Sequence, residues 1–116
     1  MLMATEKPAR IHLKARHPIT GRKPFYRDWW FEHEGVVFRI SADWLRSTVW
    51  TIQPDIDHLD GRGQLQFVES PAYWVSVALG LEDARHQLAT FIASPQFAEL
   101  RDVYNALSSQ APNRNR

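Results

Sequence analysis

Residues 27–40 (RDWWFEHEGVVFRI) constrain the fold of this chain more than any other stretch. Apolar and polar residues alternate on both sides of Glu34-Gly35, which predicts two antiparallel strands joined by a two-residue turn. Neighbouring residues of a strand point to opposite faces of the sheet. The adjacent Trp29 and Trp30 are therefore expected on different faces, one in the core and the other exposed.

Two registers are compatible with this hairpin. The two-residue turn pairs Trp30 with Arg39 across the strands and directs Trp29 into the core. Trp30 is then exposed, with Arg39 as its cation–π partner. A three-residue turn over residues 33–35 exchanges the faces and buries Trp30. We adopt the first register, and in either one a tryptophan of the pair is displayed.

The alternation continues before and after the hairpin, and it then gives way to the period of helices. Further strands are predicted over residues 9–16, 48–53 and 64–68. Helices are predicted over residues 72–79, 82–93 and 95–108, the first and third of them after a Ser-Pro pair that suits a helix start. This order predicts an α+β fold, an N-terminal antiparallel sheet of four or five strands covered on one face by two or three C-terminal helices.

Two connections between these elements carry specific expectations. In residues 41–47 the alternation stops, and Ser41 is expected to cap one helical turn that folds Trp44 and Leu45 back on the core. Residues 55–63 contain several acids and two glycines. We expect them to form a polar loop.

The 116 residues are enough for one domain with a core of its own. We expect this domain to cover residues 9–108, between a flexible leader (1–8) and a disordered tail (109–116). The chain has no cysteine, which excludes disulfides and thiolate metal ligands. Its longest apolar run, residues 72–81, is too short to span a bilayer. A cytoplasmic location, no membrane association and no cofactor are expected.

The sequence carries no catalytic or metal-binding signature, so we predict neither a catalytic residue nor a metal site. Residues 55–61 are the densest group of metal-type ligands, but their spacing does not match an EF-hand loop. The five histidines include neither a His-Glu-x-x-His motif nor a pair four residues apart. An enzyme whose active site is assembled from distant residues stays an alternative.

The function that we favour from the sequence is non-enzymatic binding to a protein partner. Trp, Tyr and Arg are enriched at the centres of protein interfaces, and the predicted hairpin displays these residue types. The predicted contact residues are Tyr26, Arg27, Trp30, Glu32 and Arg39. Inhibitors, adaptors and accessory subunits act in this way, as do anti-defence proteins of phages and mobile elements, although no motif points to that last class. A homodimer through the apolar residues 73–81 is an alternative.

A second hypothesis is nucleic-acid binding through the first strand and the turn-rich segment that follows it, residues 19–24. Residues 1–30 contain seven Lys and Arg against two acids, whereas residues 31–113 are acidic overall. Such a segment can contact phosphates, or it can pair with the chain's own carboxylates. The residues predicted for nucleic-acid contact are Arg10, His12, Lys14, Arg16, Arg22 and Lys23.

Overall fold

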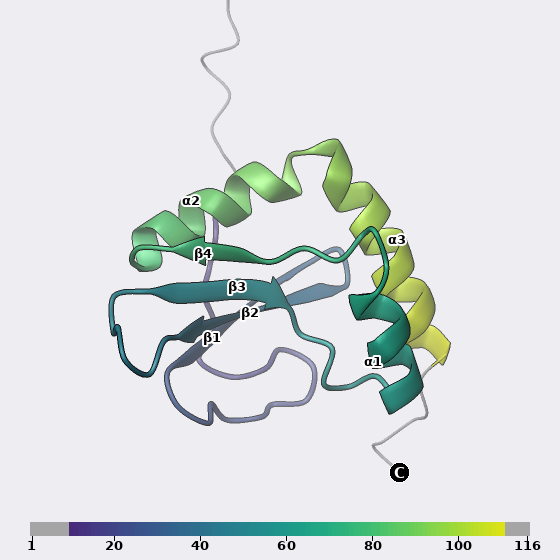
Figure 1. Ribbon diagram of the computed structural model, residues 1–116, viewed down its shortest axis with the longest axis horizontal. Coiled ribbons are helices and arrows are strands. Elements are labelled where there is room, and N and C mark those ends of the chain that lie inside the picture. The colour runs from purple at the N-terminus through teal and green to yellow at the C-terminus, as the bar shows by residue number, and fades with distance from the viewer. Residues whose placement is uncertain (1–9, 111–116) are drawn as a thin grey trace, which may run out of the picture.

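The structure is a computed structural model that describes residues 10–110, with a four-stranded antiparallel sheet and three α-helices (Figure 1). The strands lie side by side in the order β1 (Asp28–His33), β2 (Val36–Ala42), β3 (Trp50–Pro54) and β4 (Ser76–Ala78). The helices are α1 (Gly61–Val68), α2 (Leu81–Ile92) and α3 (Pro95–Gln110). The predicted α+β class with an antiparallel sheet is confirmed.

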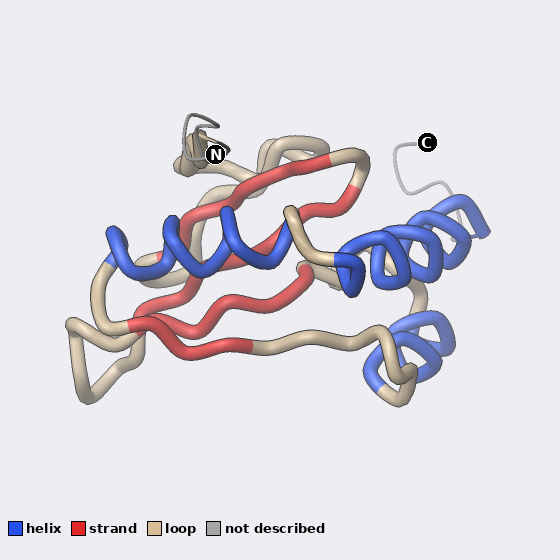
Figure 2. The backbone as a smooth tube through the Cα atoms, turned by 90° about the horizontal axis from the view of Figure 1, so that it is seen from above, coloured by secondary structure: helices blue, strands red, loops and turns tan. Residues whose placement is uncertain are grey.

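Helices α2 and α3 cover one face of the sheet, and α1 packs beside α3 at one end of it (Figures 1 and 2). The core lies between these layers, where the alternating apolar residues of the strands meet the apolar stripes of the helices. Its fully buried members include Phe38, Ile40, Ile52, Phe67, Leu88, Leu100 and Tyr104. Within residues 10–110, no helix has the length and apolar character that crossing a membrane requires.

Helix α2 begins and ends one residue before the predicted range 82–93, and α3 begins at the predicted residue 95. Strand β3 begins two residues later than the strand predicted over 48–53. Helix α3 also includes the first two residues of the predicted tail, residues 109 and 110. The rest of that tail and the predicted leader, residues 1–8, lie outside the described residues.

The β1–β2 hairpin has the register of the two-residue turn. Trp30 lies opposite Arg39, and Trp29 lies on the helix-covered face, where it packs against the core. Glu34 and Gly35 have φ angles of 50° and 86°. Two consecutive positive φ values are the requirement of a type I′ turn, which matches the twist of the strands it joins.

Helix α3 holds this turn from outside. Glutamate adopts a positive φ only at a steric cost, and two contacts offset that cost at Glu34. Arg101 donates to the Glu34 carboxylate at 2.6 Å, and the Asn105 amide donates to the Glu34 carbonyl at 3.2 Å. The turn is therefore fixed by a helix that is distant in sequence.

Helix α1 lies where a polar loop and a strand over residues 64–68 were predicted, and the strand prediction was wrong. The Asp60 carboxylate accepts a hydrogen bond from the Gly63 backbone at 2.7 Å and so caps the first turn of a helix. Phe67 is the only buried residue of α1. Over such a short apolar stretch, periodicity does not separate a helix from a strand.

Strand β4 lies where a helix over residues 72–79 was predicted, and that prediction was also wrong. The hydroxyl of Ser70 accepts a hydrogen bond from the Ala72 backbone at 3.0 Å within a turn, and no helix follows it. The chain then extends and pairs with β3, with Val77 exposed on the edge strand. A nearly continuous apolar sequence is equally compatible with a buried helix and with a strand.

The segment predicted as the first strand, residues 9–16, is not a strand of the sheet in its described part. Lys14 forms an isolated antiparallel bridge with Trp30, with N–O distances of 2.7 and 2.9 Å. Ile11 is buried and Leu13 packs on the core, as the alternation predicted, whereas Ala15 is exposed. The segment shields the outer edge of β1 and so protects it from pairing with other chains.

Candidate functional site

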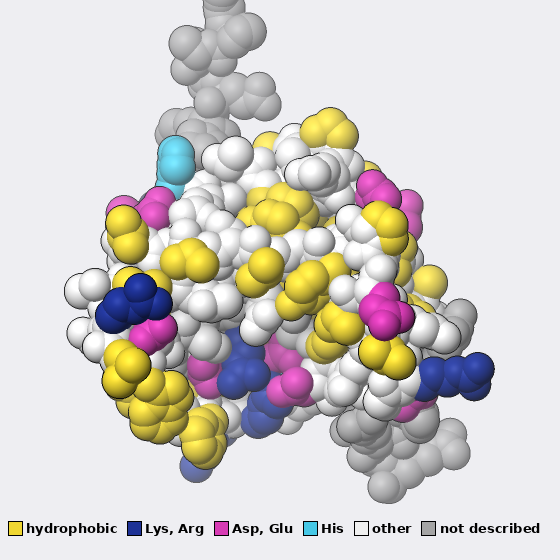
Figure 3. All heavy atoms as spheres, viewed as in Figure 1, with side chains coloured by type: hydrophobic (Ala, Val, Ile, Leu, Met, Phe, Trp, Pro, Cys, Tyr) yellow, Lys and Arg dark blue, Asp and Glu magenta, His cyan; other side chains and the backbone are white. Residues whose placement is uncertain are grey.

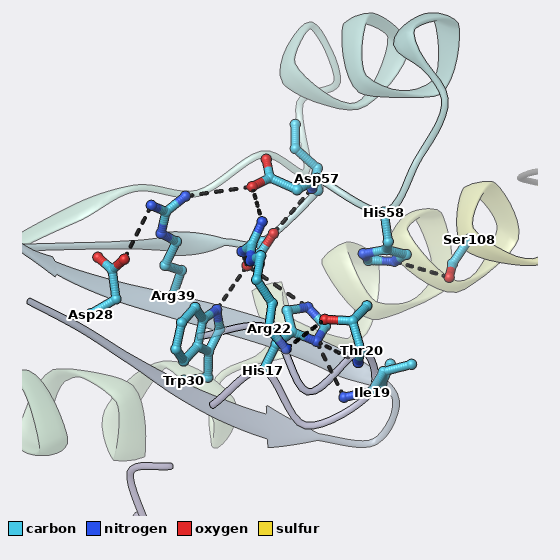
Figure 4. A network of polar contacts seen from close by, with 12 residues as sticks. His17, Ile19, Thr20, Arg22, Asp28, Trp30, Arg39, Asp57, His58 and Ser108 are labelled. Atoms are coloured by element: carbon cyan, nitrogen blue, oxygen red, sulfur yellow. Dashed lines mark hydrogen bonds and ion pairs between the residues drawn. The ribbon is translucent and has the colours of Figure 1, made fainter. Parts of the chain in front are cut away.

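The prediction that Trp30 is exposed was wrong. Trp30 is fully buried although the hairpin has the predicted register. The reason is that the connector, residues 14–27, folds back over this face of the sheet (Figure 4). The Arg22 guanidinium lies 5.6 Å from the centre of the indole, in the cation–π position predicted for Arg39. The connector therefore covers the second face of the sheet around Trp30.

Asp55 is buried directly after β3 and is the centre of a polar cluster under the connector. Its Oδ2 accepts hydrogen bonds from the indole Nε1 of Trp30 and from Arg22, both at 2.8 Å. Arg22 also donates to Asp57 at 2.5 Å, and the Tyr104 hydroxyl donates to the Asp55 carbonyl at 2.6 Å. Asp55 thus ties the connector and α3 to the sheet, and Arg22 compensates its buried charge.

His17 lies beside Asp55, and its hydrogen bonds determine which ring nitrogen carries the proton. Nδ1 accepts the backbone N–H groups of Ile19 and Thr20, each at 3.2 Å. The proton of the neutral ring is then on Nε2, which faces Asp55 Oδ2 at 3.8 Å. Burial lowers the pKa of His17, and the Asp55 carboxylate opposes this shift. Neutral His17 thereby holds the turn that begins the connector.

His17, Asp55 and His58 are the group of described residues that has the ligand types for a metal ion, with ligand atoms within 4.8 Å of one another. A metal-bound histidine normally donates its second ring N–H to an acceptor, whereas the second nitrogen of His17 accepts two N–H groups. Arg22 also occupies the Asp55 oxygen that faces the group. We therefore assign the cluster a structural role.

A hydroxyl–imidazole pair borders the same cluster, with His58 Nε2 and Ser108 Oγ 3.2 Å apart (Figure 4). A serine nucleophile also needs donors for an oxyanion and a cleft for its substrate. Neither residue lines the grooves of about 630, 530 and 380 Å³ in the described part of the chain. The pair therefore gives no support to an active site assembled from distant residues, and such a site stays a prediction.

Four exposed apolar side chains come together from two loops at one corner of the molecule (Figure 3). The connector contributes Phe25 (83% exposed) and Tyr26 (38%), and the β2–β3 loop contributes Trp44 (68%) and Leu45 (93%). Tyr26 stacks on Trp44 with ring centres 4.4 Å apart, and Phe25 approaches the same indole edge-on at 6.3 Å. We name these four residues the apolar patch.

The local structure of the β2–β3 loop explains why Trp44 and Leu45 point into solvent. The Asp43 carboxylate accepts the backbone N–H groups of Leu45 (2.7 Å) and Arg46 (2.9 Å), which makes a tight turn and lowers the pKa of Asp43. The helical turn predicted over residues 41–47, with both apolar side chains on the core, is therefore absent, and that prediction was wrong.

Two of the five residues predicted to contact a protein partner belong to this corner. Tyr26 is a member of the apolar patch. Arg27 is exposed in the next position and lies 5.0 Å over the ring of Trp50, while it donates to the Ser47 carbonyl at 3.3 Å. Its guanidinium is held in place beside the patch.

The other three predicted contact residues lie elsewhere. Trp30 is buried in the polar cluster. Arg39 is half-buried between the carboxylates of Asp28 and Asp57, at 3.3 and 3.6 Å. Glu32 is exposed on β1, where it lines a groove with the basic N-terminal segment. The exposed tryptophan predicted at Trp30 is thus absent from the hairpin.

The basic residues predicted for nucleic-acid contact lie in different surroundings. Arg10, His12 and Lys14 line a groove of about 380 Å³ together with the acidic Glu32. Arg22 is engaged within the polar cluster. Two more, Arg16 and Lys23, are exposed in the connector. Part of the basic charge is compensated inside the molecule, and nucleic-acid binding stays a prediction.

Comparison with protein-family models, with curated proteins and with solved structures finds no match to this chain.

Two residues of the patch, Trp44 and Leu45, were predicted to fold back on the core and are exposed instead. One signal could have indicated their exposure, because an aspartate in a loop often accepts the backbone N–H groups of the residues that follow it and so forms an Asx-turn. Asp43 makes such a turn, and Trp44 and Leu45 lie directly after it.

Proposed function

We propose that the protein is a non-enzymatic binding protein and that the apolar patch is the surface by which it occupies a partner protein. The observation that carries the proposal is the exposure of Phe25, Trp44 and Leu45 at one corner, each by two thirds or more of its side-chain surface. Large contiguous apolar patches on a protein surface often mark interaction sites.

The energy available to such a contact is considerable. Burying one large apolar side chain contributes about 1.5–3 kcal/mol, and interface hot spots are enriched in Trp and Tyr. Trp44 and Tyr26 meet both conditions, and Phe25 and Leu45 add apolar area beside them. A partner that covers the patch gains this free energy without any change in the core.

The patch is also ordered before it meets a partner. Trp44 is fixed by the Asp43 turn on one side and by the stacked Tyr26 ring on the other. The connector that carries Tyr26 is in turn held down by Asp55 and Arg22. Side chains that are already ordered lose less entropy on binding, which favours affinity. Inhibitors, adaptors and accessory subunits, including anti-defence proteins, are the classes that such a surface fits.

Site-specific photo-crosslinking tests the proposal. A photoreactive amino acid replaces Leu45, and the protein is irradiated in a lysate of its source cell. The matched control carries the same amino acid in place of Thr90, which is exposed on α2. We expect a discrete crosslinked protein from position 45 that is absent from position 90.

A second substitution, in the crosslinking variant itself, tests whether the crosslink depends on the apolar patch. Trp44→Ser in the crosslinking variant removes the stacked indole and should abolish the crosslink, because the neighbouring anchor is lost. Crosslinks of equal yield and identity from positions 45 and 90, or no crosslink from position 45, would contradict the proposed function.

A further inference from the structure

We infer that the apolar patch of one molecule docks into an apolar groove between α1 and α3 of a second copy, so that chains associate head to tail. The inference rests on the proposed function in that it uses the same patch as a protein-binding surface. It adds the identity of a partner, the chain itself, and the surface on that partner which receives the patch.

The groove offers apolar surface that the patch can cover. It is a shallow, open groove of about 530 Å³ between the end of α1 and the outer side of α3. Its apolar lining is formed by Pro71, Val103, Ala106 and Leu107, and Gln66, Ser70 and Asp102 complete it. Phe25 and Leu45 protrude from their loops, with more than four fifths of each side chain exposed. Protruding apolar side chains and a shallow apolar groove on the same chain can bury each other between two copies.

The charges around the two surfaces are opposite in sign. The patch is bordered by the exposed cations Lys23, Arg27 and Arg46. Asp102 lines the groove, and two exposed acids are close to lining residues along the chain: Glu69 directly precedes Ser70, and Glu99 lies one helical turn before Val103. Arg46 and Asp102 each have an ion-pair partner in their own molecule, at 3.3 and 3.2 Å. The remaining charges favour the approach of one copy's patch to another copy's groove and disfavour patch against patch.

The two surfaces lie at opposite ends of the molecule. The β2–β3 loop that carries Trp44 and Leu45 is at the left of Figure 1, and α1 and α3 are at the right. A molecule therefore cannot fill its own groove with its own patch. Contact between unlike surfaces of identical chains is heterologous and leaves a free patch and a free groove after each addition.

Pairing through the edge of β4, another route to self-association, is hindered by side chains of α2. The Gln87 side chain donates to the Val77 carbonyl at 3.0 Å. The Asp83 carboxylate accepts the Leu79 backbone N–H at 2.9 Å. A strand of a second copy would have to displace these contacts in order to pair with the edge. The homodimer predicted through the apolar side chains of residues 73–81 is a separate contact and stays a prediction.

The contact is small, and we expect it to be weak. Four side chains cover less than the roughly 800 Å² per partner of a standard interface. We expect a dissociation constant on the order of 10–100 µM. Sedimentation velocity of the full chain from about 5 to about 500 µM should show a weight-average sedimentation coefficient that rises with concentration.

Complementary variants identify the two surfaces. Leu45→Ser removes the tip of the patch, and Ala106→Glu places a charge in the groove; both residues are exposed, so thermal melts should match wild type. Each variant alone should stay monomeric. Their equimolar mixture should form a 1:1 dimer and nothing larger, because one intact patch and one intact groove remain. Leu79→Ser, a loss of an equally apolar exposed side chain elsewhere, should associate like wild type.

Three outcomes would overturn the inference: a wild type that stays monomeric over this range, a mixture of the two variants that stays monomeric, or self-association of Ala106→Glu at the wild-type level. Photo-crosslinking at position 45 separates these failures from failure of the proposed function. A monomeric chain that crosslinks another protein from position 45 overturns self-association alone, whereas a monomeric chain with no crosslink overturns both.

Discussion

At the scale of single residues, Trp30 is the side chain on which the connector depends. Its indole N–H donates to the buried Asp55 carboxylate, and Arg22 lies over its ring. The sequence predicts the strand, its register and the face to which Trp30 points. It does not predict what covers that face, because the connector is held by contacts to Asp55, more than thirty residues along from Arg22.

Trp30→Phe tests this dependence. The variant loses a hydrogen bond to a charged group, a contribution of about 1.5–3 kcal/mol, together with part of a buried ring. We expect the free energy of unfolding to fall by about 2–4 kcal/mol, measured by urea denaturation with far-UV circular dichroism. Trp29→Phe, at a half-buried position of the same strand, should cost less. An equal loss in the two variants would show that the Asp55 bond contributes nothing.

His17 makes the connector sensitive to acid. Protonation of Nδ1 is incompatible with the two backbone N–H groups it accepts, and burial lowers the pKa of His17 below its usual value. The groups that face it are Asp55 and Asp57, which oppose the shift, and Arg22 and His58, which add to it. The unfolded chain binds the proton more readily. His17 therefore contributes stability that is complete above about pH 6.5 and is lost as the pH falls through the lowered pKa.

The measurement is the melting temperature between about pH 7.5 and about pH 5. His17→Asn retains an oxygen that can accept the same backbone N–H groups as an Asx-turn, but it does not titrate. We expect the variant to lose less stability than wild type over this range. If both proteins lose the same amount, the acid sensitivity arises from other groups.

At the scale of elements, local signals predict the hairpin and the last two helices well. The hairpin is specified by its turn residues and by strict alternation, and α2 and α3 have long apolar stripes. At α1 a strand was predicted and a helix is found, and at β4 a helix was predicted and a strand is found; both segments are short. Residues 61–68 become helical through the cap at Asp60, and Ser76–Ala78 extend because β3 offers an open edge.

Gly35→Ala tests the turn of the hairpin. Alanine at a φ of +86° is strained, and its Cβ would lie 2.8 Å from the Asn105 side-chain oxygen. We expect a loss of about 1–2 kcal/mol in the free energy of unfolding, measured by thermal or urea denaturation. Gly61→Ala is the matched control, because a Cβ there meets nothing within 4 Å. That variant should be as stable as wild type or up to about 1 kcal/mol more stable. Equal effects at the two glycines would contradict a type I′ turn packed on α3.

At the scale of the whole molecule, the apolar patch is a product of tertiary structure. Tyr26 and Arg27 were predicted as contact residues for a protein partner, and in the structure Tyr26 belongs to the apolar patch and Arg27 lies beside it. The sequence does not predict that Trp44 lies beside Tyr26, because that contact joins two loops that meet only when the connector is folded over β1. The displayed tryptophan that we expected within the hairpin is carried instead by the loop at its end.

Because the apolar patch lies outside the core, changes in it should affect binding and leave folding unaltered. Leu45→Ser and Trp44→Ser should unfold within about 0.5 kcal/mol and about 1 kcal/mol of wild type, respectively, the larger value reflecting the lost stacking on Tyr26. Urea denaturation gives both values. A loss above about 3 kcal/mol would mean that these side chains belong to the core.

The affinity of the purified crosslinked partner for wild type and for Trp44→Ser tests the central claim most directly, with Leu79→Ser as the control for exposed apolar area. Loss of a hot-spot side chain costs about 2 kcal/mol or more, which is a weakening of about thirty-fold or more. We predict this loss for Trp44→Ser and an unchanged affinity for Leu79→Ser. An affinity of Trp44→Ser within about two-fold of wild type would contradict the assignment of the apolar patch as the binding surface.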